Sequence, residues 1–177
     1  YGLHAEAAYW QSVVELNTWQ QDRIAQHVVQ RLFGTVTGKR IAVLGFAFKA
    51  DTNDTREAPA IRICQDLLEE GAQLAIYDPK VPESQIASDL GCQPLSSPVG
   101  SPLSGDGVWH RVTTPTEAVA QADAVLILTE WASFAQLNWQ ELAGQMRKPA
   151  WLFDARSIAD LAAAQAAGLQ VWRVGCG

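Results

Sequence analysis

Positive charge is scarce in this sequence, and several other features are missing altogether. The 177 residues include 13 lysines and arginines against 19 acidic residues, which gives a net charge of −6. We therefore expect no broad surface for nucleic acid or anionic membranes, and any anion-binding site has to be local. No run of about 18 consecutive apolar residues occurs, so the sequence predicts no membrane-spanning helix.

Cysteine is also rare. The three cysteines, Cys64, Cys92 and Cys176, show no metal-binding spacing, and their odd number argues against a framework of disulfides. This pattern favours a reduced, cytoplasmic setting. The opening residues lack the basic and apolar regions of a signal peptide. Because the sequence does not begin with methionine, we expect it to be a piece of a longer chain.

Proline and glycine are absent from a long stretch near the N-terminus, residues 5–33. Its apolar side chains recur mostly every three or four residues, which predicts one long helix. A helix of about 28 residues spans roughly 42 Å, more than a small domain needs. We expect residues 1–36 to be a connector or dimerisation helix rather than a helix that folds back on its own domain. Residues 37–177 are then a separate domain.

In the second part, short apolar runs alternate with helical patterns. The runs predict strands at 41–48, 73–79, 109–112, 123–128, 149–153 and 169–174. Such alternation is typical of a Rossmann-like, doubly wound α/β fold with a mainly parallel sheet and helices on both faces. Residues 95–107 are of low complexity and predict a tolerated loop.

Charged and aromatic side chains follow these strands. They are Lys49, Asp78, Glu130, Trp131 and Arg156. Since the carboxyl ends of parallel strands share one edge, we expect a crevice there with two cations suited to a phosphate-bearing ligand. The alternative is a solvated loop whose polar residues only cap a helix. Trp131 could stack on a base or simply pack, and Asp78 could hold a ribose or form a turn.

The usual dinucleotide fingerprint is incomplete. Gly45 is followed by Ala47 and Ala50, where the pattern Gly-x-Gly-x-x-Gly requires glycines. We therefore expect that this domain does not carry NAD in the usual cradle. No catalytic constellation is present either, and His4, His27 and His110 are interpreted as ordinary histidines.

Four motifs together resemble one family. They are Gly45–Lys49 with Asp51–Glu57, Ile76–Val81, Thr129–Trp131 and Phe153–Arg156. These stretches are similar to the C-terminal nucleotide-binding domain of the UDP-glucose 6-dehydrogenases, within the UDP-glucose/GDP-mannose dehydrogenase family. Residues 9–33 resemble the end of that family's central dimerisation helix.

The resemblance implies particular roles. Phe48, Lys49 and Arg156 match contacts to the UDP-sugar substrate, and Arg56 matches an arginine that reaches NAD held mainly by another Rossmann domain. The family oxidises the C6 alcohol of the sugar to a carboxylate in two NAD-dependent hydride transfers, through a thiohemiacetal on a cysteine. That cysteine and the NAD fingerprint belong to sequence before Tyr1. No catalytic residue is therefore assigned in this chain, and we expect it to be inactive alone.

Two alternatives remain open at this point. The same family includes enzymes that act on UDP-N-acetylmannosamine or GDP-mannose, and the chain could also be a non-catalytic nucleotide-binding or dimerisation module. One departure concerns the site itself, because the family often has glycine where this chain has Ala155. The resemblance also implies a homodimer formed through the long helix.

Overall fold

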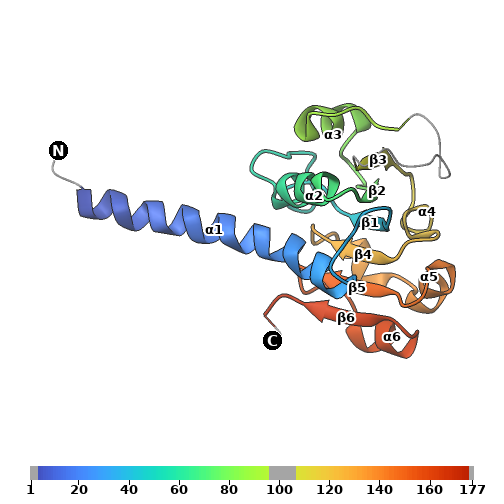
Figure 1. Ribbon diagram of the computed structural model, residues 1–177. Coiled ribbons are helices and arrows are strands. Elements are labelled where there is room, and N and C mark those ends of the chain that lie inside the picture. The colour runs from blue at the N-terminus through green and yellow to red at the C-terminus, as the bar shows by residue number, and fades with distance from the viewer. Residues whose placement is uncertain (1–3, 96–106, 176–177) are drawn as a thin grey trace.

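A six-stranded sheet with helices around it follows one long N-terminal helix (Figure 1). The structure, a computed structural model, describes residues 4–95 and 107–175, so most of the predicted 95–107 loop lies outside the described residues. In chain order the elements are α1 (His4–Arg31), β1 (Arg40–Leu44), α2 (Pro59–Glu69), β2 (Gln73–Tyr77), α3 (Glu83–Leu90), β3 (Val108–Arg111), α4 (Pro115–Val119), β4 (Ala124–Ile127), the 3-10 helix η1 (Ala132–Gln136), α5 (Trp139–Gln145), β5 (Trp151–Asp154), α6 (Leu161–Ala166) and β6 (Gln170–Arg173).

The strands lie in the order β3-β2-β1-β4-β5-β6, and every described pair is parallel. Leu44, at the end of β1, is in register with Tyr77 of β2 and Ile127 of β4. The chain thus winds outward from β1 in one direction and from β4 in the other. The doubly wound fold predicted from the sequence is confirmed, and the boundary between β1 and β4 is its topological switch point.

The central strands are buried on both faces. Every residue of β1 and β4 is buried, as expected for continuous apolar runs in a parallel sheet. Right-handed crossovers in opposite directions place α2 and α3 on one face of the sheet and α4, α5 and α6 on the other. This arrangement agrees with the contacts of α2 with α3 and of α5 with α4 and α6.

The two halves of the long helix α1 lie in different environments. Its C-terminal half packs on the domain, where Ile24 and Val28 are buried, and the ring of His27 lies 5.2 Å from that of Trp172 on β6. The N-terminal half projects away from the sheet (Figure 1). The C-terminal half of the predicted connector therefore packs on its own domain, which the sequence analysis did not expect.

The projecting half leaves large apolar side chains in solvent. They are Tyr9, Trp10, Val14, Leu16 and Trp19, each more than half exposed. Within residues 4–95 and 107–175, no helix combines the length and apolar character that a membrane crossing requires.

Three local details differ from or refine the sequence predictions. The first strand ends at Leu44, because Gly45 takes a φ of 90° and turns the chain. Helix α3 was not predicted, since only Ile86 and Leu90 of its eight residues are buried. Helix α4 is capped by Thr114, whose hydroxyl accepts the backbone N–H of Glu117 at 3.1 Å.

Candidate functional site

The carboxyl ends of β1 and β4 meet at the switch point, where open α/β sheets bind their ligands. Thr129 follows β4, and its hydroxyl donates to the carbonyl of Ala47, 2.6 Å away, in the loop that follows β1. Thr129 is fully buried. The contact fixes the start of this loop, residues 45–58, against the neighbouring strand.

A buried carboxylate organises the same loop. One oxygen of Asp78 accepts the backbone N–H groups of Phe46 and Ala47, at 2.7 and 3.0 Å. The other accepts those of Lys80 and Val81, at 2.9 and 3.0 Å. Asp78 is fully buried, so these hydrogen bonds offset the cost of removing its charge from water. Of the two roles left open for this residue, the structure shows the turn-forming one.

Trp131 completes the set of donors around that carboxylate. Its indole N–H donates to the Asp78 carboxylate at 3.2 Å, and the side chain is only 6% exposed. The ammonium of Lys80 lies 5.8 Å from the centre of the Trp131 ring and donates to the Asp51 carbonyl at 2.9 Å. Trp131 is therefore packed into the domain, and its ring is not a free stacking platform for a base.

The predicted substrate residues Phe48 and Lys49 lie on the exposed part of the loop. Phe48 is 45% exposed, while its backbone N–H donates to the Asp54 carbonyl at 2.9 Å. Lys49 is exposed as well. The loop backbone is thus fixed by hydrogen bonds, and both side chains are left accessible.

Arg56 lies on the surface near the end of this loop. Its side chain is 88% exposed and makes a two-pronged contact with Asp54, with Nε–Oδ1 and Nη2–Oδ2 distances of 2.9 and 2.6 Å. Hydrogen bonds from the Arg56 side chain and backbone lower the pKa of Asp54 to about 2. Arg56 is accordingly held within the loop, and an anionic ligand would have to compete with Asp54 for its guanidinium.

Arg156, the other predicted substrate residue, follows β5. Its Nε donates to the Leu128 carbonyl at 2.7 Å and lies 3.5 Å from a carboxylate oxygen of Glu130. Both partners follow β4, so the side chain reaches across the strand ends. Because β1 and β5 flank β4, the ends of these two strands are roughly 10 Å apart. Lys49 and Arg156 therefore project from the same edge of the sheet.

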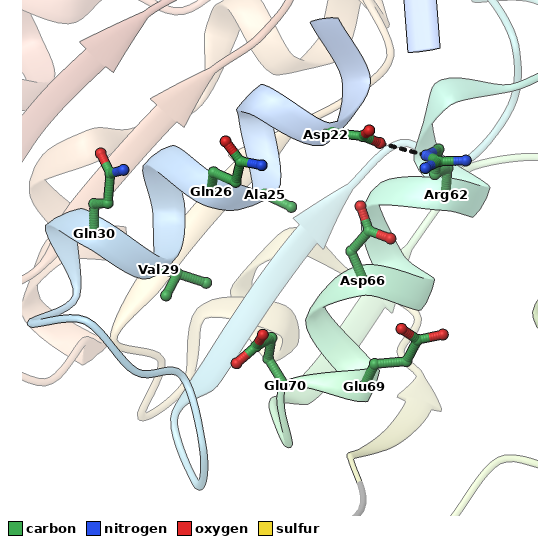
Figure 2. A pocket seen from close by; sticks show the side chains of 9 residues that line it. All are labelled: Asp22, Ala25, Gln26, Val29, Gln30, Arg62, Asp66, Glu69 and Glu70. Carbon is green, nitrogen blue, oxygen red and sulfur yellow. Dashed lines mark hydrogen bonds and ion pairs between the residues drawn. The ribbon is translucent and has the colours of Figure 1, made fainter. Parts of the chain in front are cut away.

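Arg156 also lines a cavity of about 180 Å³. The other walls come from α1, from the start of α2 and from the ends of β4 and β6. A larger groove of about 440 Å³ lies between α1 and α2, where Asp22 pairs with Arg62 at one end and Glu69 and Glu70 lie at the other (Figure 2). Only the cavity at Arg156 lies at the carboxyl edge of the sheet, so it is the candidate ligand site of the two.

Among the residues that the structure describes, histidines and cysteines do not gather into a second site. Burial raises the pKa of the Cys64 thiol, which is fully buried and inert, and Cys92 is an exposed free thiol. Burial and the charge of Arg40 lower the pKa of His110, which lies far from Arg156 on β3. Among the described residues no group of His, Cys, Asp or Glu could hold a metal ion.

The geometry also tests whether this domain could cradle NAD. A dinucleotide turn offers free backbone N–H groups to the pyrophosphate. Here the N–H groups of Phe46 and Ala47 already donate to the carboxylate of Asp78. The loop therefore supplies its own anion and does not fit NAD in the usual position, as the missing glycines predicted.

The strand order, together with a candidate site at the carboxyl edge of the sheet, defines a Rossmann-like α/β domain. The particular family follows from comparison with known proteins: residues 42–161 match the model of the UDP-glucose/GDP-mannose dehydrogenase family, UDP binding domain. The chain belongs to this family. The matched region extends from β1 to the start of α6 and includes both Lys49 and Arg156.

Curated relatives agree with this assignment. The chain is 44% identical over 169 residues to UDP-glucose 6-dehydrogenase of Drosophila melanogaster, covering 96% of this chain and 35% of the relative. It is 41% identical over 183 residues to UDP-glucose 6-dehydrogenase 4 of Arabidopsis thaliana, covering 98% and 37%. The chain thus spans about a third of the length of these relatives.

Solved structures support the fold. A UDP-glucose dehydrogenase from the archaeon Pyrobaculum islandicum is similar with a TM-score of 0.66 at 22% identity, over 92% of this chain and 31% of that one. A UDP-D-ManNAc dehydrogenase from Pyrococcus horikoshii gives 0.63 at 21% identity, over 88% and 30%. At these identities the comparison concerns the fold alone.

Arg156 and the loop after β1 were candidates from the sequence, but several of their hydrogen-bond and ion-pair partners were not predicted. The pairing of Asp54 with Arg56 had a local signal, because the two residues are only two positions apart. Leu128, which holds Arg156, is an ordinary strand residue in the sequence, and only the register of β4 with β5 brings it close. The amide side chains of α1 that line the cavity gave no signal at all.

Proposed function

We propose that the chain is the UDP-sugar-binding part of an NAD-dependent UDP-glucose 6-dehydrogenase, which converts UDP-glucose to UDP-glucuronate in two hydride transfers. The observation that carries this proposal is the family match over residues 42–161, together with relatives above 40% identity that are UDP-glucose 6-dehydrogenases. The same relatives favour UDP-glucose over UDP-N-acetylmannosamine and GDP-mannose, the alternatives left open by the sequence.

Phe48, Lys49 and Arg156 are the proposed substrate contacts. Lys49 is exposed on a loop that is fixed at its base, and Arg156 is held through Nε while it lines the cavity. Cations at these two positions suit the diphosphate of the nucleotide, and Phe48 provides exposed apolar surface beside them. Arg156 is anchored before ligand arrives, which lowers the entropy lost on binding.

NAD is the proposed cofactor, held mainly by another domain of a longer protein. Arg56 is the residue of this chain that reaches it, as an exposed cation able to exchange Asp54 for a phosphate. When bound, NAD accepts the hydride; this chain contributes substrate binding and no catalytic group. The chain alone is therefore expected to be inactive, and we infer a cytoplasmic homodimer in which α1 connects or pairs subunits.

Titration of UDP tests this function. Calorimetry or NMR would compare the wild-type chain with Lys49→Ala, Arg156→Ala and Arg56→Ala. Wild type should bind weakly, and removal of Lys49 or Arg156 should weaken binding by about 1–3 kcal/mol, as expected for a charged hydrogen bond. Arg56→Ala serves as the matched control and should bind like wild type, because its assigned ligand is NAD.

Two results would contradict the assignment. Equal losses at Arg56 and Lys49 would indicate general electrostatic attraction rather than separate roles. Reduction of NAD by this chain with UDP-glucose would show that the catalytic group is present here. A non-catalytic binding module would bind UDP in the same titration, and a full-length protein that oxidises no nucleotide sugar would favour that alternative.

A further inference from the structure

Helix α1 forms one wall of the cavity beside Arg156. Asn17, Gln20 and Gln21 line it, and Ile24 continues the same side of the helix toward the core. These positions recur at the three- and four-residue spacing that brings side chains to one helix face. The helix that projects from the domain therefore passes beside the carboxyl edge of the sheet and adds three amide side chains to it.

The lining of this cavity is neutral except for its arginine, and the Glu130 carboxylate that lies 3.5 Å from Arg156 Nε is not part of the lining. Its described lining consists of the three amides, the Arg156 guanidinium, Pro59 and small or aliphatic residues, and it contains no carboxylate. Arg156 uses Nε for the Leu128 carbonyl. Within the described residues its two terminal nitrogens make no hydrogen bond, so they are available to a ligand in the cavity.

A second groove on a different side of α1 provides a contrast. Gln26 and Gln30 are among its lining residues, together with Asp66 and Glu69 of α2 and the following Glu70 (Figure 2). The ion pair of Asp22 with Arg62 closes one end. The same helix thus presents amides to two sites. Four acidic residues line the second groove, whereas the carboxylate near the Arg156 cavity, that of Glu130, is paired with Arg156 Nε at 3.5 Å and repels a diphosphate less.

The size of the cavity limits what it can accept. A volume of about 180 Å³ corresponds to roughly six water molecules. Pockets for whole drug-sized ligands measure roughly 300–1,000 Å³. The cavity has room for one moiety of a nucleotide sugar, and the rest of such a ligand would extend beyond it.

We propose that Asn17, Gln20 and Gln21 bind the hydroxyl groups of the sugar, next to the phosphates that meet Arg156. A side-chain amide both donates and accepts hydrogen bonds, as a sugar hydroxyl does, so the two groups are complementary. The proposal rests on the proposed function, because it assumes the same nucleotide sugar, with the phosphates bound at the sheet edge and the sugar bound by α1. The three amides are thereby specificity-determining contacts for the sugar.

The test compares UDP-glucose with UDP on the wild-type chain and on Asn17→Ala and Gln20→Ala. Each substitution should weaken UDP-glucose binding about 3- to 10-fold, the range for one neutral hydrogen bond. UDP binding should change less than about 2-fold, because UDP lacks the sugar. Gln26→Ala and Gln30→Ala are matched controls on the same helix and should change neither affinity. Alanine is the best helix former, so all four variants should keep α1.

The outcomes separate this inference from the function on which it rests. If wild type binds UDP and UDP-glucose but the Asn17 and Gln20 variants match the controls, the amides do not contact the ligand. If these variants lose UDP and UDP-glucose equally, the sugar assignment is wrong. In both cases the proposed function stands. A wild-type chain that binds neither ligand would overturn both.

Discussion

Gly45 and Thr129 approach each other so closely that no side chain fits between them. A Cβ atom at Gly45 would lie 2.5 Å from the Cβ of Thr129 and 2.8 Å from its backbone nitrogen. Real Cβ atoms essentially never come this close to a neighbour. The residues that directly follow β1 and β4, between which the sheet reverses its winding, are therefore tightly packed against each other.

Replacing Gly45 with alanine should destabilise the protein by roughly 2–4 kcal/mol, because overpacking adds to the strain of a positive φ. Gly168→Ala is the control: Gly168 has a similar φ of 85°, but nothing lies within 4 Å of its Cβ position. That variant should lose only about 1–2 kcal/mol. Urea unfolding measures both, and equal losses would show that the contact with Thr129 costs nothing.

The carboxylate of Asp78 should be essential to the loop after β1. Asp78→Asn leaves one acceptor oxygen for five N–H donors and should cost about 2–4 kcal/mol of unfolding free energy. Trp131→Phe removes a single donor and should cost about 1 kcal/mol. Both are measured by urea unfolding. A loss for Asp78→Asn no greater than that for Trp131→Phe would mean that water replaces the buried network.

Stability should fall as the pH drops through about 6.5, the ordinary pKa of histidine. Burial and then the charge of Arg40 lower the pKa of His110 in the folded protein. Burial, Arg23 and Arg31 lower that of His27. The unfolded chain therefore binds more protons than the folded chain below pH 6.5, and this difference favours unfolding.

The change is checked by urea unfolding between about pH 7.5 and 5.5, where most carboxylates keep their charge. His110→Gln should lose less stability over this interval than wild type does, and combining it with His27→Gln should flatten the dependence further. An unchanged slope in the double variant would assign the pH dependence to other groups.

The projecting half of α1 should associate with a second copy of the chain. Trp10 and Leu16 are 65% and 63% exposed, and large apolar side chains gathered on one segment are unfavourable in water. Sedimentation at micromolar concentration should show a dimer. The double variant Trp10→Gln, Leu16→Gln keeps helix propensity and should be monomeric.

Phe33→Gln provides the control for this prediction, because Phe33 is 75% exposed but lies beyond the end of α1. It should remain dimeric. A wild-type chain that stays monomeric over the whole concentration range would show that the exposed apolar residues do not mediate self-association.

The sequence was sufficient for the architecture because strand and helix patterns alternate clearly. Parallel strands place their ends on one edge, so the neighbourhood of Lys49 and Arg156 could be predicted without coordinates. The role of Asp78 could not, because an aspartate before a proline suits both a ligand contact and a turn. Only the N–H groups around it in space distinguish these roles.

Helix α1 shows a different limit of sequence reasoning. Its apolar spacing is continuous, so the pattern does not reveal where burial stops, and Ile24 and Trp10 have opposite environments. Asn17 and Gln20 resemble ordinary surface residues of a helix. Their position beside Arg156 depends on how α1 crosses the strand ends, which is a tertiary property.

The buried carboxylate of Asp78 affects how tightly a ligand can bind to this domain. A loop whose N–H groups waited for a phosphate would have to order itself during binding, at a cost of about 1–2 kcal/mol per residue fixed. Here the carboxylate has already ordered the residues around Phe46, and Lys80 secures Asp51. The domain therefore meets its ligand as a largely rigid template, and affinity depends on the side chains that the loop displays rather than on its folding.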